Sequence, residues 1–474
     1  MPHLLADAPV SRLPSRRPAG RSRWAAHAPF GVVLAVAAGL RIVTMLGYRP
    51  GRVYYIDSYE YLGLALHLRP GTGFRGIGYP LLLRLFLPFH SVPVVVATQH
   101  VLGLATGLLI YALLRRRGVP GWGAVLATVP VLFDGQMLQL EHAVLSDTLF
   151  LFLVVVAVVT LMWSPGRPSA RAAAGAGLAL AAAALTRSAG LPLLLLVLLY
   201  LAVRRIGVRR FAAAAVAGLL PLALFAGWYR ADNGRFALSG TDGVALWART
   251  MTFADCRRIQ PPPDEAALCP NGTRQDAASE YVWDPRSSLN RMRGGAAANN
   301  DLARSFALRA ILAQPLDYLG AVGRDVSLTF HWTPARHPRR VTPAFGFAKG
   351  RWAPVGVPPS ALRTLSSYDP GATGEYHSVE PYAAVLRAYQ YPAYLRGPFL
   401  AAILLAGALG LRRGGTLLPW GTAVTLLVVP VAVLDFDHRY VLPVVPVACL
   451  AAALALAGRP GERRVRRPSG DPRR

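Results

Sequence analysis

The sequence predicts an all-α polytopic membrane protein, and its composition and long apolar runs carry that prediction. Of its 474 residues 53% are hydrophobic and 16% are charged, whereas soluble domains typically contain about 25% charged residues. Runs such as residues 191–203 have no polar stripe, which is typical of lipid-embedded helices. The composition excludes a disordered chain, and the length is unusual for a single soluble domain.

We expect about ten membrane spans, because a helix needs about 20 apolar residues to cross the hydrocarbon core. The third and fifth candidates are short, so the count has a margin of one or two. The predicted spans are residues 29–48, 92–114, 121–133, 142–163, 172–186, 189–203, 211–228, 394–411, 416–434 and 440–457.

The formal charge of +27, from 51 basic and 24 acidic residues, would by itself favour a nucleic-acid-binding protein. The distribution of the charge excludes a nucleic-acid-binding protein. The short segments between alternate predicted spans, with the two termini, carry 23 arginines and three acids, which is +20 of the total charge. Basic short loops face the cytoplasm, so both termini are predicted there, in a multi-pass protein of the plasma (inner) membrane. These segments are residues 1–28, 115–118, 164–171, 204–210, 412–415 and 458–474.

The predicted organisation alternates membrane modules with one large polar region. A module of about seven spans contains the first outer loop, residues 49–91, with an interfacial helix. The predicted divisions are a basic cytoplasmic N-terminus at 1–28, the first membrane module at 29–228, a mixed extracytoplasmic region at 229–393, C-terminal spans at 394–457 and a basic cytoplasmic tail at 458–474.

The extracytoplasmic region contains two of the three cysteines, Cys256 and Cys269. On the oxidising side of a membrane they are expected to form a disulfide, the alternative being two free thiols. Residues 299–332 have helical periodicity, and Pro315 suits the first turn of a second helix there.

The first outer loop contains a carboxylate, Asp57, where the chain leaves the membrane. An amphipathic helix is expected from Ser58, and either residue is suited to cap it. One interpretation of Asp57 is therefore a helix cap on an exposed loop. The other is catalytic, since a carboxylate at the membrane interface is costly unless it is hydrated or paired.

Several motifs resemble one family in their order and topological placement. They are LRIVTMLG ending the first span, DSYEY and GYPLLLRLF in the first outer loop, EHAVLSDTLFLFL, LTRSAGLPLLL, AILAQPLDYL, and DHRYVLPVVP entering the last span. The chain resembles glycosyltransferases of the C-type fold, in the clan of protein O-mannosyltransferases and lipid A aminoarabinose transferases. Family members often have two adjacent acids where this chain has Asp57 and Ser58.

The resemblance implies an enzyme that moves a hexose or pentose from a polyprenyl phosphate to an acceptor on the outer face, with inversion at the anomeric carbon. Such a displacement needs a base for the acceptor hydroxyl and a clamp for the leaving phosphate. Asp57 is the predicted base, and Glu60, one helical turn further on, is expected to assist it or to lie on the helix surface.

Arginine suits the phosphate clamp, because its planar fork matches phosphate oxygens. Arg187 and Arg439 lie at predicted outer boundaries, where the alternative is an arginine that snorkels to lipid headgroups. Arg41, inside the first span, is expected to face Asp147 or a phosphate. The remaining predicted lining residues are Tyr55, Tyr59, Glu141, His142, Asp147 and His438.

No metal is expected, although Asp57, Glu141 and His142 are the residue types that hold a hard divalent ion. The resemblance implies no cofactor other than the lipid-linked sugar, and expected partners are membrane lipid, that donor and an envelope glycan, lipid or secreted-protein acceptor. The competing classes are a transporter or flippase, and a non-catalytic envelope assembly protein. Transporters favour ionisable groups at mid-membrane and internal repeats, whereas the ionisable residues here gather at the predicted outer boundary and no repeat is visible.

Overall fold

The computed structural model describes residues 23–71, 73–339 and 346–457, and these are mostly helical. Within them, four segments are long and apolar enough to cross a membrane, and a fifth is a pair of helices bent by 56°. The four segments are α1 (Ala28–Gly47), α4 (Val92–Arg116), α10 (Val208–Asn233) and His438–Ala457, which contains η7 (His438–Tyr440) and α22 (Val444–Ala457); the bent pair is α5 (Gly121–Phe133) and α6 (Gly135–Glu141).

The other apolar helices have 9 to 17 residues, short of the about 20 that a full crossing needs. They are α3 (Gly78–Phe86), α7 (Asp147–Met162), α8 (Ala170–Thr186), α9 (Gly190–Val203), α20 (Gly397–Leu409) and α21 (Leu417–Val433). Each predicted span therefore contains a helix. By length and composition the described residues hold four to five candidate spans, and the predicted number of ten is not confirmed.

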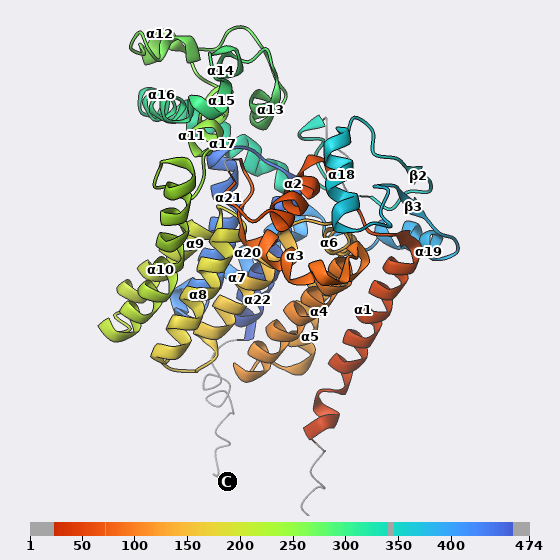
Figure 1. Cartoon of the computed structure of the whole chain (residues 1–474). Helices are drawn as coiled ribbons and strands as arrows, with labels where there is room; N and C mark the ends of the chain where they lie inside the picture. The colour runs from red at the N-terminus through yellow and green to blue at the C-terminus, as the bar shows by residue number, and fades with distance from the viewer. Residues whose placement is uncertain (1–22, 72, 340–345, 458–474) are drawn as a thin grey trace, which may run out of the picture.

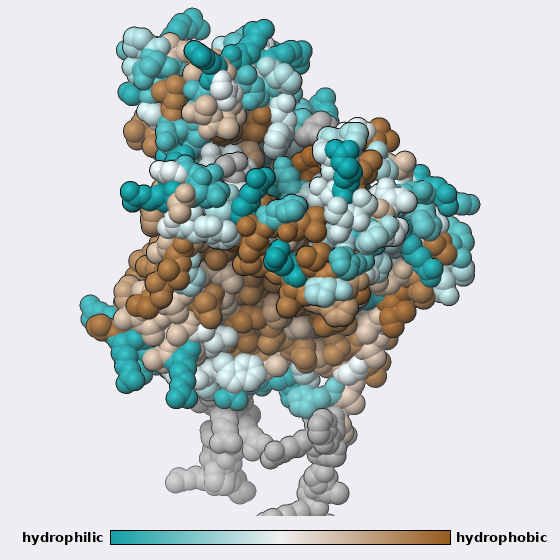
Figure 2. All heavy atoms as spheres, in the orientation of Figure 1, coloured by the Kyte–Doolittle hydropathy of each residue, from teal (hydrophilic) through white to brown (hydrophobic). Residues whose placement is uncertain are grey.

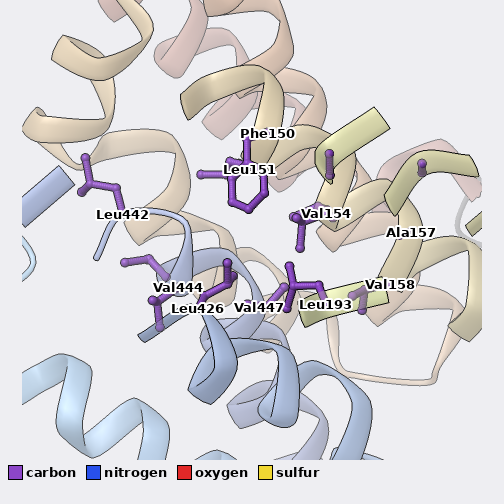
Figure 3. Packing of buried hydrophobic residues seen from close by; sticks show 14 of the residues in the cluster. Phe150, Leu151, Val154, Ala157, Val158, Leu193, Leu426, Leu442, Val444 and Val447 are labelled. Atoms are coloured by element: carbon purple, nitrogen blue, oxygen red, sulfur yellow. The ribbon is translucent and has the colours of Figure 1, made fainter. Parts of the chain in front are cut away.

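The apolar helices pack into one bundle around α7, α9, α21 and α22. Phe150 and Val154 of α7 lie with Leu193, Leu426 and Val447 in its interior (Figure 3). On the face shown in Figure 2, hydrophobic residues cover much of the outside of this bundle, while hydrophilic residues gather above and below it. That belt of apolar surface is the feature expected of a protein in a bilayer.

The polar segment between α10 and α20, here called the head, lies at one end of the bundle and forms two lobes (Figure 1). The first lobe has a hydrophobic core of its own, centred on Trp247, Leu289 and Phe306. A disulfide joins Cys256 to Cys269 within it, as predicted. Its helices are α11 (Asp242–Thr250), α12 (Cys256–Ile259), η3 (Ala266–Leu268), α13 (Ala278–Trp283), α14 (Ser288–Arg291), α15 (Gly295–Ala298), α16 (Asn300–Ala313) and α17 (Pro315–Ser327), followed by η4 (Leu328–Phe330).

The second lobe is attached to the start of the first loop through a small antiparallel sheet of order β1-β3-β2. Tyr48 pairs with Ser378, and Arg351 pairs with His377. In this lobe α18 packs on α2 and α19 packs on α1. The elements are β1 (Tyr48–Arg49), β2 (Arg351–Trp352), α18 (Pro359–Tyr368), β3 (Tyr376–Ser378) and α19 (Tyr382–Gln390).

The helix of the first loop, α2 (Tyr55–Leu66), begins three residues before the predicted start, and neither Asp57 nor Ser58 caps it. Ser58 lies in the first turn, where its hydroxyl accepts a hydrogen bond from the Tyr54 amide (2.7 Å) and donates one to the Val144 carbonyl (2.7 Å). The capping interpretation of Asp57 is therefore wrong, and its carboxylate faces other partners. Residues 1–22 of the predicted basic N-terminus (1–28) and the whole predicted basic tail (458–474) lie outside the described residues.

Candidate active site

Asp57 lies between two arginines that come from distant parts of the chain. Its Oδ1 accepts a hydrogen bond from Arg75, and its Oδ2 accepts one from Nη1 of Arg439 at 3.0 Å. Only 13% of its side chain is exposed. Burial raises the pKa of Asp57, but the charges of Arg439 and Arg75 outweigh it, so the pKa lies below its usual value. The carboxylate is thus held ionised.

Arg439 is oriented by the short turn that precedes α22. Asp437 accepts a hydrogen bond from the Arg439 amide (3.0 Å) and lies 3.1 Å from its Nε. The Arg439 side chain is 10% exposed, so the turn, and not solvent, fixes the position of its guanidinium. Burial raises the pKa of Asp437, although Arg439 opposes that shift.

Arg187 provides a second cation beside the first. It ends α8 in an extended conformation, and its guanidinium is paired with Asp147 at the start of α7. The Arg187 and Arg439 guanidinium carbons lie 5.0 and 5.3 Å from the ring centre of Tyr440. Two arginines that contact one aromatic ring form a compact cationic surface.

These groups line one cavity of about 430 Å³ between the head and the bundle. It brings together the first loop, the α8–α9 turn, α13 of the head and the turn before α22. The lining includes Tyr54, Asp57, Arg75, Thr186, Arg187, Ser279, Glu280, Trp283, Asp435, Asp437, Arg439 and Tyr440.

The structure therefore brings Asp57, Arg187 and Arg439 together as the sequence suggested, with Asp147 behind Arg187. Glu60 is not among the residues that line the cavity; its carboxylate is 43% exposed and 3.0 Å from Nε of Arg75. Burial raises the pKa of Glu60, and Arg75 opposes that shift.

Arg41 does not line this cavity, because it belongs to a separate buried network. Its Nη2 lies 2.7 Å from Oε1 of Glu141, not beside Asp147. Oε2 of Glu141 lies 2.8 Å from His100, whose other nitrogen is 3.1 Å from His142; the latter contacts the Tyr48 carbonyl. Glu141 and His142 are thus used to join α1, α4 and α6, and they do not form a ligand group with Asp57.

Two other predicted lining residues lie elsewhere. Tyr59 is buried under the second lobe, beside Gly374. His438 points to Tyr394, with 3.0 Å between Nε2 and the hydroxyl. The side chain of Tyr55 lies outside the described residues.

Sequence reasoning missed Arg75 and the contribution of α13. Arg75 lies in the first outer loop together with four other arginines, so no signal in the sequence distinguished it from them. Nothing in the spacing indicated that Glu280 and Trp283 would reach the same cavity from the head.

Among the residues that the structure describes, one group of side chains has atoms close enough to hold a metal ion, within 4.8 Å of one another: Asp325, His337 and Asp435. Arg249, fully buried, already pairs with Asp325, and His337 lies 2.8 Å from Asp435. Burial lowers the pKa of His337, but the bond to Asp435 outweighs it and the pKa is raised. Asp325 is thus already paired with Arg249, and Asp435 is already hydrogen-bonded to His337, so we assign no metal here.

Comparison with known proteins supports the resemblance over part of the chain. Residues 93–207 match the family model "Dolichyl-phosphate-mannose-protein mannosyltransferase", which confirms that prediction for this stretch. It contains Asp147 and Arg187, while Asp57, Arg75 and Arg439 lie outside it. No curated protein matches the chain in sequence.

Three of the solved structures with a similar course of the chain are the following. The Saccharomyces cerevisiae protein O-mannosyltransferase Pmt1-Pmt2 complex is 15% identical, with a TM-score of 0.36 over 52% of this chain and 38% of that one. The Archaeoglobus fulgidus oligosaccharyltransferase is 14% identical, with a TM-score of 0.42 over 92% of this chain and 51% of that one. ArnT of Cupriavidus metallidurans, bound to undecaprenyl phosphate, is 13% identical, with a TM-score of 0.37 over 91% of this chain and 78% of that one. The chain thus spans two fifths to four fifths of their lengths.

Proposed function

We propose that this chain is an integral-membrane glycosyltransferase that moves a sugar from a polyprenyl-phosphate donor to an acceptor hydroxyl by an inverting displacement. The observation that carries the proposal is the meeting of one ionised carboxylate, Asp57, with Arg187 and Arg439 in a cavity where the apolar bundle meets the head. The match to the mannosyltransferase family model over residues 93–207 supports the same reaction class.

Asp57 acts as the general base. The acceptor oxygen forms a bond to the anomeric carbon, its proton passes to Asp57, and the bond from that carbon to the phosphate oxygen breaks. Polyprenyl phosphate leaves with the electron pair. A carboxylate that is ionised before the acceptor arrives is ready for this step, although a lowered pKa also makes it a weaker base.

The donor phosphate binds between Arg187 and Arg439. A phosphate presents more acceptor oxygens than a carboxylate and matches the guanidinium fork. When Arg439 donates hydrogen bonds to the phosphate, its interaction with Asp57 weakens. The Asp57 carboxylate then becomes a stronger base. Donor binding would thereby prepare the base for the acceptor.

The membrane arrangement is part of the proposal. The short apolar helices join the four to five long spans to give about ten crossings, and the head lies outside the cytoplasm. Both termini, with residues 1–28 and 458–474, face the cytoplasm of a plasma membrane. The polyprenyl chain then lies between spans, with its phosphate at the outer boundary. No metal takes part in the reaction as proposed.

The test is reconstitution of the full chain in liposomes with polyprenyl-phosphate mannose or polyprenyl-phosphate arabinose as the donor, and with a glycan or a Ser/Thr peptide as the acceptor. We expect the parent to release polyprenyl phosphate at a rate that EDTA does not change. In Asp57→Asn the rate of release should be about 10²–10⁴-fold lower. The matched control is Asp264→Asn, in the head outside the cavity. An inserted, folded Asp57→Asn variant with parental transfer would exclude Asp57 as the base. Lipid or solute flux without sugar transfer would favour a flippase or transporter instead.

A further inference from the structure

The stretch between α6 and α7, residues 142–146, lies between the two catalytic parts of the cavity, and we call it the connector. It is buried throughout, with no residue more than 1% exposed. Asp147, which follows it directly, pairs with Arg187 of the proposed phosphate clamp. The first loop, which carries the proposed base Asp57, contacts the connector itself. One short segment therefore touches both the base-bearing loop and the clamp.

Backbone and side-chain hydrogen bonds tie the first loop to the connector. Arg52 forms a parallel β-bridge with Ala143, made of two backbone hydrogen bonds of 2.9 Å. In α2 the Ser58 hydroxyl accepts from the Tyr54 amide and donates to the Val144 carbonyl, both at 2.7 Å. A serine hydroxyl has one proton to donate and lone pairs to accept with, so a single side chain serves both bonds. The first turn of α2 is thus fastened to the connector at Ser58.

Tyr61 repeats the contact one helical turn later. Its hydroxyl lies 2.8 Å from that of Ser146, and the residue lines the cavity. The connector is held in turn from α4, because Nε2 of Gln99 donates to the Ala143 carbonyl at 2.7 Å. The Gln99 side-chain oxygen accepts from the Tyr79 hydroxyl of α3, also at 2.7 Å. The connector is therefore a fixed support on which α2 is placed.

Ser58 is the contact nearest to the proposed chemistry. It is 0% exposed and follows Asp57 directly in the first turn of α2. The two neighbouring side chains have different partners, since Asp57 faces Arg75 and Arg439 while Ser58 faces the connector. A change in how Ser58 is held therefore moves the turn that carries the carboxylate, without touching either arginine.

We propose that Ser58 is a positioning residue, whose hydroxyl holds the first turn of α2 on the connector and thereby sets the Asp57 carboxylate relative to the clamp arginines. Tyr61 assists it through Ser146. This inference rests on the proposed function, because it is the proposed base and clamp that are kept in register. A reacting group that is displaced by about 1 Å can cost about 10²-fold in rate.

The kinetic test uses the full chain in liposomes, with the polyprenyl-phosphate sugar and the acceptor both present. We expect Ser58→Ala to lower kcat about tenfold and to leave the Kd for undecaprenyl phosphate within about twofold, because the clamp stays in place. Ser58→Thr retains the hydroxyl and should recover most of the rate. Tyr61→Phe should lower kcat less than Ser58→Ala does.

The matched control is Ser288→Ala. Ser288 is 6% exposed, and its hydroxyl donates to the Leu268 carbonyl at 3.2 Å in the first lobe, outside the cavity. This variant also loses a buried bond from a serine to a carbonyl, but it should keep the parental kcat. If Ser58→Ala does not fold, Ser58→Cys takes its place, since a thiol is a weaker donor of similar shape.

A second measurement does not need turnover. A carbodiimide modifies a carboxyl group in its protonated form, and peptide mass spectrometry reports the labelling of Asp57 against pH. The charged groups that surround this carboxylate are Arg75, Arg187, Arg439, Glu60 and Asp437. When Ser58→Ala lets the buried carboxylate move away from an arginine, its labelling should begin at a higher pH than in the parent. Ser288→Ala should label as the parent does.

The outcomes distinguish this inference from the function on which it rests. If no donor is consumed by the parent, the reaction is wrong, and the labelling curve still decides whether Ser58 positions Asp57. If donor is consumed and Ser58→Ala has the parental kcat, the positioning role is overturned and the glycosyltransferase proposal stands. An equal loss of kcat in Ser288→Ala, or an unchanged labelling curve in Ser58→Ala, also overturns the positioning role.

Discussion

Arg439 donates a hydrogen bond of 3.0 Å to Asp57 across 382 residues of sequence. The bond joins the first turn of α2 to the turn that begins the last long span. It forms only when the two ends of the membrane bundle have closed on each other, so the cavity is a product of the whole fold. Both residues are largely buried, with 10% and 13% of their side chains exposed.

The first prediction concerns the phosphate clamp. Arg439→Lys and Arg187→Lys should each weaken binding of polyprenyl phosphate by about 10- to 100-fold, because a lysine keeps the charge but loses the planar fork, and hydrogen bonds to charged groups contribute about 1.5–3 kcal/mol. The measurement is the Kd for undecaprenyl phosphate in detergent or nanodiscs.

The matched control for the clamp is Arg257→Lys, since Arg257 lies in the head with 93% of its side chain exposed. Equal affinity in the parent and both clamp variants would show that the arginines interact with lipid headgroups and not with the donor.

The second prediction is a pH shift governed by Arg75. Arg439 and Arg75 together hold the pKa of Asp57 below its usual value, against the effect of burial. Removing Arg75 in Arg75→Gln removes one of these charges, so the pKa of Asp57 rises. Because the base must be ionised, the acid limb of kcat/KM against pH should move to higher pH.

Arg75→Lys retains the charge and should keep the acid limb near its parental position. If the acid limb of kcat/KM against pH does not move in Arg75→Gln, that limb reflects the titration of a group other than Asp57. Glu60 is the first alternative, because it also pairs with Arg75.

Particular residues show how far the sequence alone could lead. The apolar runs and basic loops located the helices, because periodicity and length are local properties. Arg187 and Arg439 could be selected because each borders an apolar run on the predicted outer side. Arg41 was misleading, since any arginine inside a span needs a counter-charge, and the sequence does not say whether Glu141 or Asp147 provides it. Pairings such as Arg75 with Asp57 depend on how a Gly- and Pro-rich loop folds back, which periodicity does not encode.

The third prediction follows from the pairing of Arg41. Arg41→Met leaves Glu141 buried beside His100 without its cation, and breaking a buried pair typically costs about 3–5 kcal/mol. We expect a clear loss of thermal stability, partly relieved in Arg41→Met/Glu141→Gln, with the Kd for undecaprenyl phosphate unchanged. Weaker lipid binding at parental stability would restore Arg41 as a phosphate ligand.

The last prediction concerns the disulfide of the first lobe. Cys256 and Cys269 are 13 residues apart, and closing a loop of this size stabilises a fold by roughly 3 kcal/mol in the chain-entropy model. The segment that they close ends at Leu268, a fully buried residue whose carbonyl accepts a hydrogen bond from Trp247 in the lobe's core. Cys256→Ser/Cys269→Ser should therefore increase amide hydrogen exchange in α11 to α16 and leave the bundle unchanged. Cys449→Ser, in the buried part of α22, is the control. Maleimide should label the native parent only after reduction, and labelling without a reductant would show that the two thiols are free.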